Sequence, residues 1–478
     1  MVEGARLEIV WAVMSRRFES SRFRHLGMKK LLIIILGIAT MVGAAAVFYF
    51  YFRDDTMDRF DVSKIPVIKL STKDEFNIEK GVWNKDVTVS VQDELEEKKV
   101  KVKTRGGSSY RVAEEYNAPY PYKIKFSEEV SVFGFPKHEE YILLPNFIDS
   151  TSVRQFFFFN LASLMLPEAE LRAKYVELEI NGEYKGLYLF VESIDEKRLG
   201  LNLENQEDFI VELEMQKQDT EVYATETRKS EAFSIRQTLD TKTGEKRHVT
   251  FELTYPEKLS MVPRKHSDFI VSTMKNAYDA LEEKKPLSEI PIDVDSFVSY
   301  FLFQEIVYNQ GYGTSSVYYY YKDGKLHAGP LWDFDRLGMT WSSEGFLKES
   351  HCDNTVYRAL LEYPEFREKI QSKFLEFYND LAPRLNNALI LLEHNSLLKE
   401  AYNKNEALYH RLSRTDLSEE GFVGNKNIEE LKTFEEQVSY FRKFYFEGYT
   451  AKKFWDDGSE TKFPARINWI KEHLEDWR

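Results

Sequence analysis

The sequence predicts an α+β protein with a bilobal main domain, a strand-rich first half and a helix-rich second half, preceded by one transmembrane helix. Apolar and polar residues alternate at period two through the first half of the chain after residue 65. Apolar residues recur at helical spacing from residue 263 onward, and an uncharged apolar segment precedes both regions. No linker rich in proline or glycine divides residues 60–478, which favours one domain.

The apolar segment is Leu31–Phe52, which carries no charge and is long enough to cross a bilayer, since a spanning helix needs about 20 residues. Basic residues between Arg16 and Lys30 precede it and mostly acidic residues follow. The positive-inside rule therefore predicts a cytoplasmic N-terminus and an extracytoplasmic main domain anchored at the cell membrane. A signal peptide cleaved near Ala44–Ala46 is the alternative, and Met28 could be the true start. The predicted parts are a cytoplasmic segment, a membrane span, a linker and the main domain, at residues 1–30, 31–52, 53–64 and 65–478.

The composition excludes several classes of protein. The formal net charge is −14 and the pI is near 5.4, whereas a nucleic-acid binder normally presents a basic face, so we expect no nucleic-acid partner. The single cysteine, Cys352, excludes an intramolecular disulfide and a cysteine-based zinc site. The nine histidines are scattered, which argues against a histidine-based zinc site.

The first half contains alternating segments that predict strands. The clearest is a hairpin, in which two alternating runs flank Asn181–Gly182, a dipeptide that adopts the positive φ angles of a type I′ turn. A helix interrupts the strands, with Asp149 or Ser150 as its cap and Pro167 at its end. Residues 216–250 are polar and rich in threonine, and we interpret them as a variable loop. The predicted strands lie at residues 87–93, 98–109, 120–126, 139–146, 173–193 and 207–215.

The second half has helical periodicity with one embedded hairpin. Asp323–Gly324 forms the turn of that hairpin, and a tyrosine-rich run, Tyr318–Tyr321, precedes it. The tyrosines could indicate a carbohydrate-associated surface protein, but strand residues alternate between two faces, so core packing explains the rings better. The predicted helices lie at residues 266–283, 293–309, 355–381, 391–412, 427–446 and 463–478.

Asp333 and Asp335 are the first candidate site residues. They lie two residues apart after the hairpin, so a regular strand would point them to opposite faces. At a strand end or bulge they could converge on one Mg²⁺ ion, which prefers hard oxygen ligands. Gly338 would then let the backbone fold over the ion. A plain turn is the alternative, because Asp-x-Asp often occurs by chance.

The loop RGGSS forms a second candidate site, with Arg105, Gly106, Gly107 and Ser108 at the end of a predicted strand. The glycines let backbone N–H groups approach an anion, and the arginine and the hydroxyl add donors. The pattern is neither a Walker A motif nor a dinucleotide fingerprint. A bare glycine turn is the alternative.

Three further positions carry candidate residues. Lys123 in YKIKF could clamp a phosphate as a point charge, although a solvated strand lysine is the alternative. Glu192 follows an apolar strand, where a hinge between lobes could lie. Asn146, Asp149 and Arg154 surround a helix start, and capping by Asp149 is the simplest explanation for that group.

In their order, these motifs resemble the spore-coat protein H (CotH) kinase family. RGGSS, YKIKF, LLPNFIDSTSVR, NGEYKGLYLFVE and KLHAGPLWDFDRLG follow one another, and YRALLEYPEFREKI and RINWIKEHL complete the set. The resemblance covers roughly residues 65–474. It implies an atypical protein-kinase-like fold that binds ATP with Mg²⁺ and phosphorylates secreted or surface proteins on serine or threonine.

The resemblance also implies a role for each candidate. Asp333 and Asp335 match the WDxD metal motif of the family. Asn309 would help to position the metal or the substrate, and Glu192 would lie near the adenine or the lobe junction. The family loop reads RGNSS, so Gly107 replaces its asparagine. The implied nucleotide-binding residues are Arg105, Gly106, Gly107, Ser108, Lys123 and Glu192.

One departure from the family bears on activity. Family members typically carry Asn-x-Asp before the aromatic strand, where a catalytic base would lie. Here Asn309 is present, but Gly311 occupies the position of the aspartate, and no acidic residue occurs from Gln310 to Lys322. A kinase gains most of its rate from positioning and electrostatic stabilisation, so loss of the base would lower transfer and spare nucleotide binding. Two hypotheses follow: an ATP- and Mg²⁺-dependent kinase for a protein substrate, or a catalytically impaired relative that binds an envelope protein.

Overall fold

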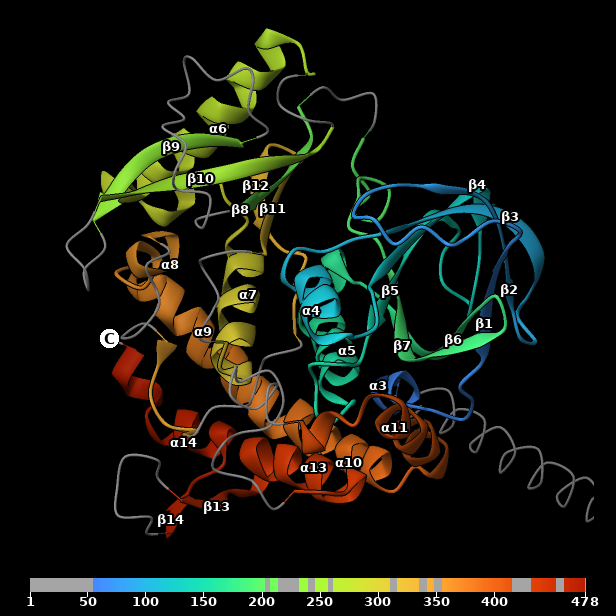
Figure 1. Ribbon diagram of the computed structural model, residues 1–478. Helices are drawn as coiled ribbons and strands as arrows, with labels where there is room; N and C mark the ends of the chain where they lie inside the picture. The colour runs from blue at the N-terminus through green and yellow to red at the C-terminus, as the bar shows by residue number, and fades with distance from the viewer. Residues whose placement is uncertain are drawn as a thin grey trace, which may run out of the picture. The chain divides into compact units, whose positions relative to one another are not determined.

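The computed structural model describes residues 55–202, 207–213, 232–239, 246–256, 261–309, 316–334, 342–347, 355–414, 431–452 and 460–477 (Figure 1). The chain divides into two compact units, residues 1–58 and 59–478. The described residues of the first unit belong to the short helix α3 (Asp55–Arg59). The second unit contains every described strand and all the described helices after α3.

Seven strands of the second unit form a closed barrel, in which neighbours pair in the order β1-β2-β3-β4-β5-β7-β6. All these pairs are antiparallel except β1 with β6, which run parallel and close the barrel. Alternate apolar residues such as Val102 and Ile124 fill the interior, and their neighbours point outward. The strands are β1 (Val67–Thr72), β2 (Asn84–Val91), β3 (Leu95–Thr104), β4 (Tyr122–Val130), β5 (His138–Pro145), β6 (Ala173–Ile180) and β7 (Glu183–Glu192).

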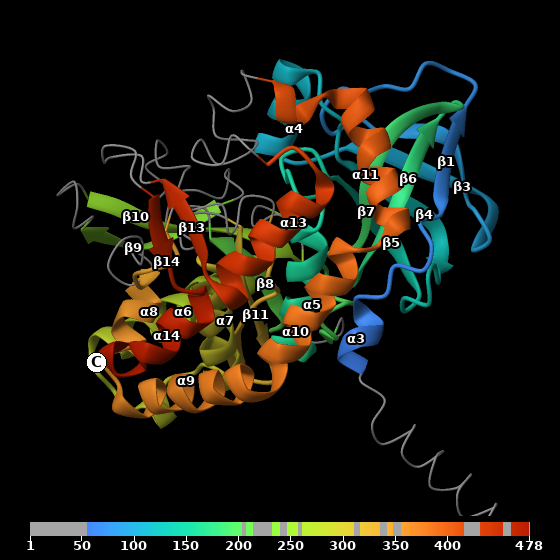
Figure 2. The ribbon, with the colours of Figure 1, turned by 90° about the horizontal axis from the view of Figure 1, so that it is seen from below.

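Two helices accompany the barrel, α4 (Ser108–Tyr116) and α5 (Arg154–Met165), and the 3₁₀ turn η1 (Pro167–Ala169) follows α5. Helix α5 is apolar on all sides, which is typical of a buried helix. Its ring of Phe156 lies 4.5 Å from Tyr175 of β6, centroid to centroid, and Phe158 lies 6.3 Å from Phe303 of the helix α7 (Val294–Val307). Helix α5 therefore lies between the barrel and the helical part of the unit (Figures 1 and 2).

A second sheet has five antiparallel strands in the order β12-β11-β8-β10-β9. One face packs against α6 (Arg264–Glu282) and α7: Tyr278 of α6 contacts Phe251, and Phe297 of α7 stacks on Tyr319 at 5.7 Å. Because cross-strand partners share a face, Glu212 and its partner Tyr318 lie together on the opposite face. The strands are β8 (Phe209–Leu213), β9 (Ala232–Leu239), β10 (Lys246–Tyr255), β11 (Val317–Lys322) and β12 (Lys325–Ala328).

The C-terminal part is mostly helical. Arg411 and Arg466, both fully buried, join it to the rest of the unit: Arg411 donates to the carbonyl of Asn146, and Arg466 pairs with Glu305 at 3.1 Å. The elements are η2 (Leu287–Glu289), α8 (Thr355–Leu360), α9 (Pro364–Glu376), the π-helix η4 (Phe377–Leu381), α10 (Ala382–Glu393), α11 (Ser396–Tyr409), η5 (Arg411–Ser413), α13 (Phe434–Arg442), the π-helix η6 (Lys443–Glu447), β13 (Tyr449–Lys452), β14 (Glu460–Phe463), α14 (Arg466–Glu472) and η7 (Leu474–Trp477).

The predicted fold class was wrong in including a transmembrane helix. Among the described residues, no helix is long and apolar enough to cross a membrane. The two most apolar helices, α5 and α7, have 12 and 14 residues and are buried core helices, whereas a span needs about 20 residues. The segment predicted to span, residues 31–52, lies outside the described residues.

Two local features of the fold prediction also have clear outcomes. The Asn181–Gly182 turn is confirmed, with φ angles of 51° and 80°. The variable loop predicted at residues 216–250 is wrong where β9 and β10 form. Pairing of β9 with β10 and of β10 with β8 holds these strands, and their own sequence pattern does not predict them. The α+β content and the strand-rich first half agree with the structure, although the strands form one closed barrel and one separate sheet.

Candidate functional site

The glycine loop connects β3 to α4. The amide of Arg105 donates to the carbonyl of Pro121 at 3.0 Å, which extends the β3–β4 pairing by one residue. Gly106 has φ +88°, and a Cβ there would collide with the hydroxyl of Ser109, so the position requires glycine. Gly107 is the N-cap of α4, and no side chain among the described residues caps this helix end. The first amide groups of α4, beginning at Ser108, thus resemble the anion-binding end of a helix.

Arg105 brings the glycine loop next to the WDFD segment. Its guanidinium carbon lies 5.4 Å from the ring centroid of Trp332, in a cation–π contact. Burial lowers the pKa of Arg105, and Tyr318, Asp333 and Glu212 oppose that shift. These residues come from four separate parts of the chain, so the fold assembles a single charged cluster around Arg105.

Asp333 lies in an irregular loop and not on a strand. Strand β12 ends at Ala328, and Asp333 has φ +70°, the left-handed region that aspartate tolerates better than most residues. The loop exposes Asp333, while its neighbours Trp332 and Phe334 pack against Phe159 at 5.5 and 4.8 Å. An exposed carboxylate between two anchored aromatic rings is a suitable donor for Mg²⁺. Asp335 lies outside the described residues.

Tyr318 and Glu212 complete the cluster from the second sheet. They are direct cross-strand partners on β11 and β8. Burial raises the pKa of the Tyr318 phenol well above its usual value, and Glu212 raises it further, in part through a hydrogen bond. The sequence pattern indicated neither residue as a member of the site. Glu212 left a faint signal, as a single acidic residue within the apolar run FIVEL.

Lys123 lies on the outer face of β4, directly opposite Lys103 of β3. It forms an ion pair with Glu140 of β5, and its side chain is 26% exposed. Lys103 connects it to the cluster, because burial lowers the pKa of Lys103, and Lys123 and Arg105 lower it further. Lys123 therefore neighbours the site, but Glu140 already neutralises part of its charge.

Glu192 belongs to a separate, buried network. It ends β7, is 2% exposed, pairs with Arg198 at 3.1 Å and accepts a hydrogen bond from the backbone amide of Arg172 at 2.8 Å. Its Oε1 atom has no hydrogen-bond partner among the described residues. Burial raises the pKa of Glu192 to about 7, against the opposing effect of Arg198. No contact in the described part of the chain joins Glu192 to Arg105.

Asn309 follows the last turn of α7. Its side-chain amide donates to Gln304 Oε1 at 2.9 Å, and its backbone amide donates to the carbonyl of Gln304 at 3.1 Å. The nearest carboxylate along the chain, Glu305, is fully buried and is held by Arg466 and by the amide of Leu347. Glu305 therefore has a structural role, and the predicted base position at Gly311 lies outside the described residues.

The helix-start motif at residues 146–154 is also structural. Asp149 accepts hydrogen bonds from the amides of Thr151 and Arg154 at 2.9 and 2.8 Å, so it satisfies the first amide of α5, but the N-cap residue is Val153 and not Asp149 or Ser150 as predicted. Arg411 donates to the carbonyls of Asn146 and Asp149. Both side-chain polar atoms of Asn146 are buried without a hydrogen-bond partner in the described residues.

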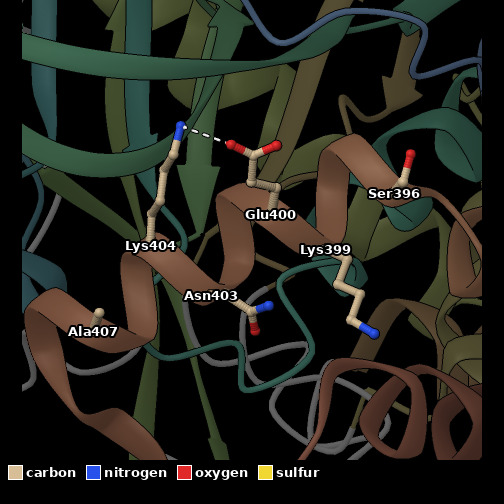
Figure 3. Close-up of a pocket in the computed structure, with 6 residues that line it drawn as sticks. All are labelled: Ser396, Lys399, Glu400, Asn403, Lys404 and Ala407. Carbon is tan, nitrogen blue, oxygen red and sulfur yellow. Dashed lines mark ion pairs between the residues drawn. The ribbon is translucent and has the colours of Figure 1, made fainter.

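A surface depression of about 500 Å³ lies elsewhere on the unit (Figure 3). All six lining residues come from the single helix α11, so the depression follows one exposed helix face and does not enclose a ligand. No group of three or more histidine, cysteine, aspartate or glutamate side chains in the described residues is arranged for a metal ion. The cluster around Arg105 therefore remains the candidate site. The residues lining the depression are Ser396, Lys399, Glu400, Asn403, Lys404 and Ala407.

A barrel, a helix-backed sheet and a glycine loop that meets an acidic loop characterise this α+β protein. A model of the family described as CotH kinase protein matches residues 102–447, which is most of the chain. The chain belongs to the CotH kinase protein family. No curated protein matches the chain.

Proposed function

We propose that this protein binds ATP with Mg²⁺ and transfers a phosphoryl group to serine or threonine of a surface or secreted protein. The observation that carries the proposal is the proximity of Arg105, in the glycine loop, to Asp333, in the WDFD segment. The two residues have opposite charges, so Arg105 suits the phosphates and Asp333 suits the metal ion in phosphoryl transfer. The fold brings them together although they lie 228 positions apart in the sequence.

The residues present suit a nucleotide with its metal ion. Arg105 and the uncapped amides of α4 supply positive charge and N–H donors for phosphate oxygens. Asp333 would hold Mg²⁺, with Asp335 as the second ligand, and Lys123 would add long-range positive charge. Bound Mg²⁺ supplies charge neutralisation at the phosphates. Tyr318 and Glu212 orient Arg105, while Asn309 would position the metal or the substrate.

The second candidate function is nucleotide or partner binding without transfer. The sequence favours it through Gly311, which stands where the family carries an acidic residue. The structure adds that Glu305, the closest preceding carboxylate in the chain, is fully buried and bound to Arg466. A protein of this kind would use the same cluster as a ligand-dependent scaffold for an envelope partner.

Thermal unfolding of the full chain with and without ATP and Mg²⁺ tests the nucleotide site. Ligand at a hundred times its dissociation constant adds about 2.7 kcal/mol, which should raise the melting temperature by a few degrees. Asp333→Ala should abolish the shift, and Asp74→Ala, an exposed aspartate outside the cluster, should leave it intact. A shift that survives in Asp333→Ala would exclude this site.

Transfer of labelled phosphate to a serine- and threonine-containing protein then separates the two candidates. Binding with transfer supports the kinase, and binding without transfer supports the scaffold. Gly311→Asp restores the acidic residue of the family, so it should raise transfer if the missing base limits the rate. No change in Gly311→Asp would show that the base is not the limiting factor.

We also propose that the large unit acts outside the cytoplasm. The support is the class of substrate that the order of motifs implies, because a kinase for surface or secreted proteins would meet them outside the cytoplasm. Protease added to intact cells should degrade the large unit. Full protection in intact cells, with degradation after lysis, would contradict this location.

A further inference from the structure

The outer face of β3 carries a lysine at every second residue from Lys99 to Lys103, and Arg105 follows the strand in the same phase. The intervening valines and threonine are buried in the barrel, so the cations point outward. On β4, Lys125 lies directly opposite Lys101, and Lys123 lies directly opposite Lys103. We call this set the lysine ladder: Lys99, Lys101 and Lys103 of β3, Arg105 directly after β3, and Lys123 and Lys125 of β4.

Few acidic residues neutralise the ladder. Glu140 of β5 forms ion pairs with Lys123 and Lys125, the latter at 2.8 Å. No carboxylate within the described ranges forms an ion pair with Lys99, Lys101 or Lys103. Cations placed directly opposite each other on a sheet repel, so a bound anion would stabilise this face.

The ladder leads directly to the candidate site. Its last member, Arg105, lies beside Asp333. The exposure of the side chains decreases toward that end, because Lys99 and Lys101 are exposed, whereas Lys103 and Arg105 are partly buried. Lys103 also lies 4.6 Å from the ring centroid of Trp83, which fixes its ammonium group on the outer face. A ligand on the ladder would therefore have one end at the Arg105 cluster.

We propose that the lysine ladder is the docking surface for an extended acidic segment of the protein substrate. This inference rests on the proposed function, because it names the class of substrate that the same site would receive. An extended peptide presents every second side chain on one side, about 6.6 Å apart, which matches the spacing of cations along β3. The fitting segment thus carries aspartate or glutamate at alternate positions, with the acceptor hydroxyl at its Arg105 end.

Length and topology favour a peptide over the nucleotide alone. From Lys99 to Arg105 the ladder extends over roughly 20 Å at the rise of a β-strand, which is longer than a triphosphate. The barrel is closed, so β3 has no free edge for backbone pairing. Recognition must therefore use side-chain charges, and these charges alternate as those of an extended peptide do.

A single-stranded nucleic acid is the competing polyanion. Such sites combine cations with exposed aromatic rings on which bases stack. Two aromatic rings in the described part of the chain contact the ladder, and both are already covered by its cations: Trp83 lies beneath Lys103, and the buried Trp332 lies beneath Arg105. The net charge of −14 also opposes a long polyanion whose far end extends beyond the ladder. Both observations favour a short acidic peptide segment.

Fluorescence anisotropy with the full chain tests the proposal. The probe is a labelled peptide that alternates glutamate with threonine, measured at low ionic strength. Lys99→Gln/Lys101→Gln should weaken its binding by roughly two- to thirtyfold, as expected for the loss of two exposed ion pairs. The matched control, Lys73→Gln/Lys443→Gln, removes the same charge from exposed positions outside the ladder and should bind as the wild type does.

Other probes define the outcomes that would overturn the proposal. A peptide with the same composition but with its glutamates in one block should bind more weakly than the alternating peptide. Equal binding of the two peptides, or an equal loss of affinity in the control variant, would show that the ladder binds anions through its charge alone. Tighter binding of an oligothymidylate than of the peptide would identify a nucleic-acid surface instead.

A charge reversal keeps the test valid if the glutamine variant folds poorly. Lys99→Glu/Lys101→Glu should no longer bind the glutamate peptide and should instead bind a peptide that alternates lysine with threonine. The melting-temperature shift with ATP and Mg²⁺ should be unchanged in both ladder variants. If the ladder variants bind the peptide as the wild type does and ATP still raises the melting temperature, the docking proposal alone is contradicted. If ATP does not raise the melting temperature, the proposed function is contradicted.

Discussion

The guanidinium of Arg105 lies over the indole ring of Trp332, 5.4 Å from its centroid. Arg105 follows a barrel strand, and Trp332 precedes the acidic loop at Asp333, so this contact joins two parts of the site. The indole is itself anchored against Phe159 of α5, 5.5 Å away between ring centroids. The position of the guanidinium is therefore fixed by the aromatic core and not by the loop alone.

Arg105→Lys should weaken ATP binding by roughly tenfold, because lysine keeps the charge but loses the planar donor fork and the stacking on Trp332. Isothermal titration with ATP and Mg²⁺ measures the effect. Arg111→Lys is the matched control, since Arg111 is an exposed arginine of α4 whose ion pair with Glu115 is 3.9 Å long. Equal losses in the two variants would contradict a specific role for Arg105.

The two loop glycines should differ in how strongly their substitution destabilises the protein. Gly106→Ala should destabilise the protein by about 1–2 kcal/mol, because φ is +88° and the added Cβ collides with Ser109. Gly107→Asn should cost less than Gly106→Ala, because no atom lies near its added Cβ and its φ of −97° is negative. Denaturant unfolding of both variants checks this order, which the reverse ranking would refute.

Glu192→Gln should reveal a pH dependence of stability. The folded-state pKa of Glu192, about 7, lies above its ordinary value of 4.5, so the folded protein holds this proton more tightly. Between these pH values, the wild type should lose stability relative to Glu192→Gln as the pH rises, by up to about 3 kcal/mol, and the difference should level off above pH 7. Unfolding by urea at a series of pH values measures the difference. A stability difference that does not change with pH would disprove the role of Glu192. Glu75→Gln, which replaces an exposed carboxylate, is the control.

Arg466→Met should destabilise the protein by about 3–5 kcal/mol, because it leaves the fully buried Glu305 without its cation. It also removes donors to the carbonyls of Ser343 and Gly345. The double variant Glu305→Leu/Arg466→Met should cost less than the single one, since no buried charge remains. Denaturant midpoints of these variants and of Glu305→Leu alone complete a double-mutant cycle, which measures the coupling energy between Glu305 and Arg466. Additive losses of stability would show that the two residues are not coupled.

Sequence patterns predicted features that depend on neighbouring residues. The Asn181–Gly182 hairpin and the hydrogen bonding of Asp149 at a helix start both follow from local backbone chemistry. The closure of the barrel through β1 and β6 was not predicted, because its register depends on packing between residues more than a hundred positions apart. The strands β9 and β10 were missed for a different reason, because their polar, threonine-rich sequence lacks a clear alternation and pairing with neighbouring strands holds them.

The site was predicted in part. The order of motifs indicated that the glycine loop and Asp333 belong together, and the structure brings Arg105 and Asp333 into one cluster. The sequence could not reveal that Glu140 pairs with Lys123, since the two residues lie on different strands. Nor could it reveal Tyr318 and Glu212, whose meeting depends on the β8–β11 register.

The parallel pairing of β1 with β6 has a consequence for expression of shorter fragments. The family match begins at residue 102, within β3, so a fragment cut there lacks β1, β2 and most of β3. Both β6 and β4 would then expose unpaired backbone groups, and exposed strand edges promote aggregation. A soluble fragment should therefore start before Val67, so that the barrel can close.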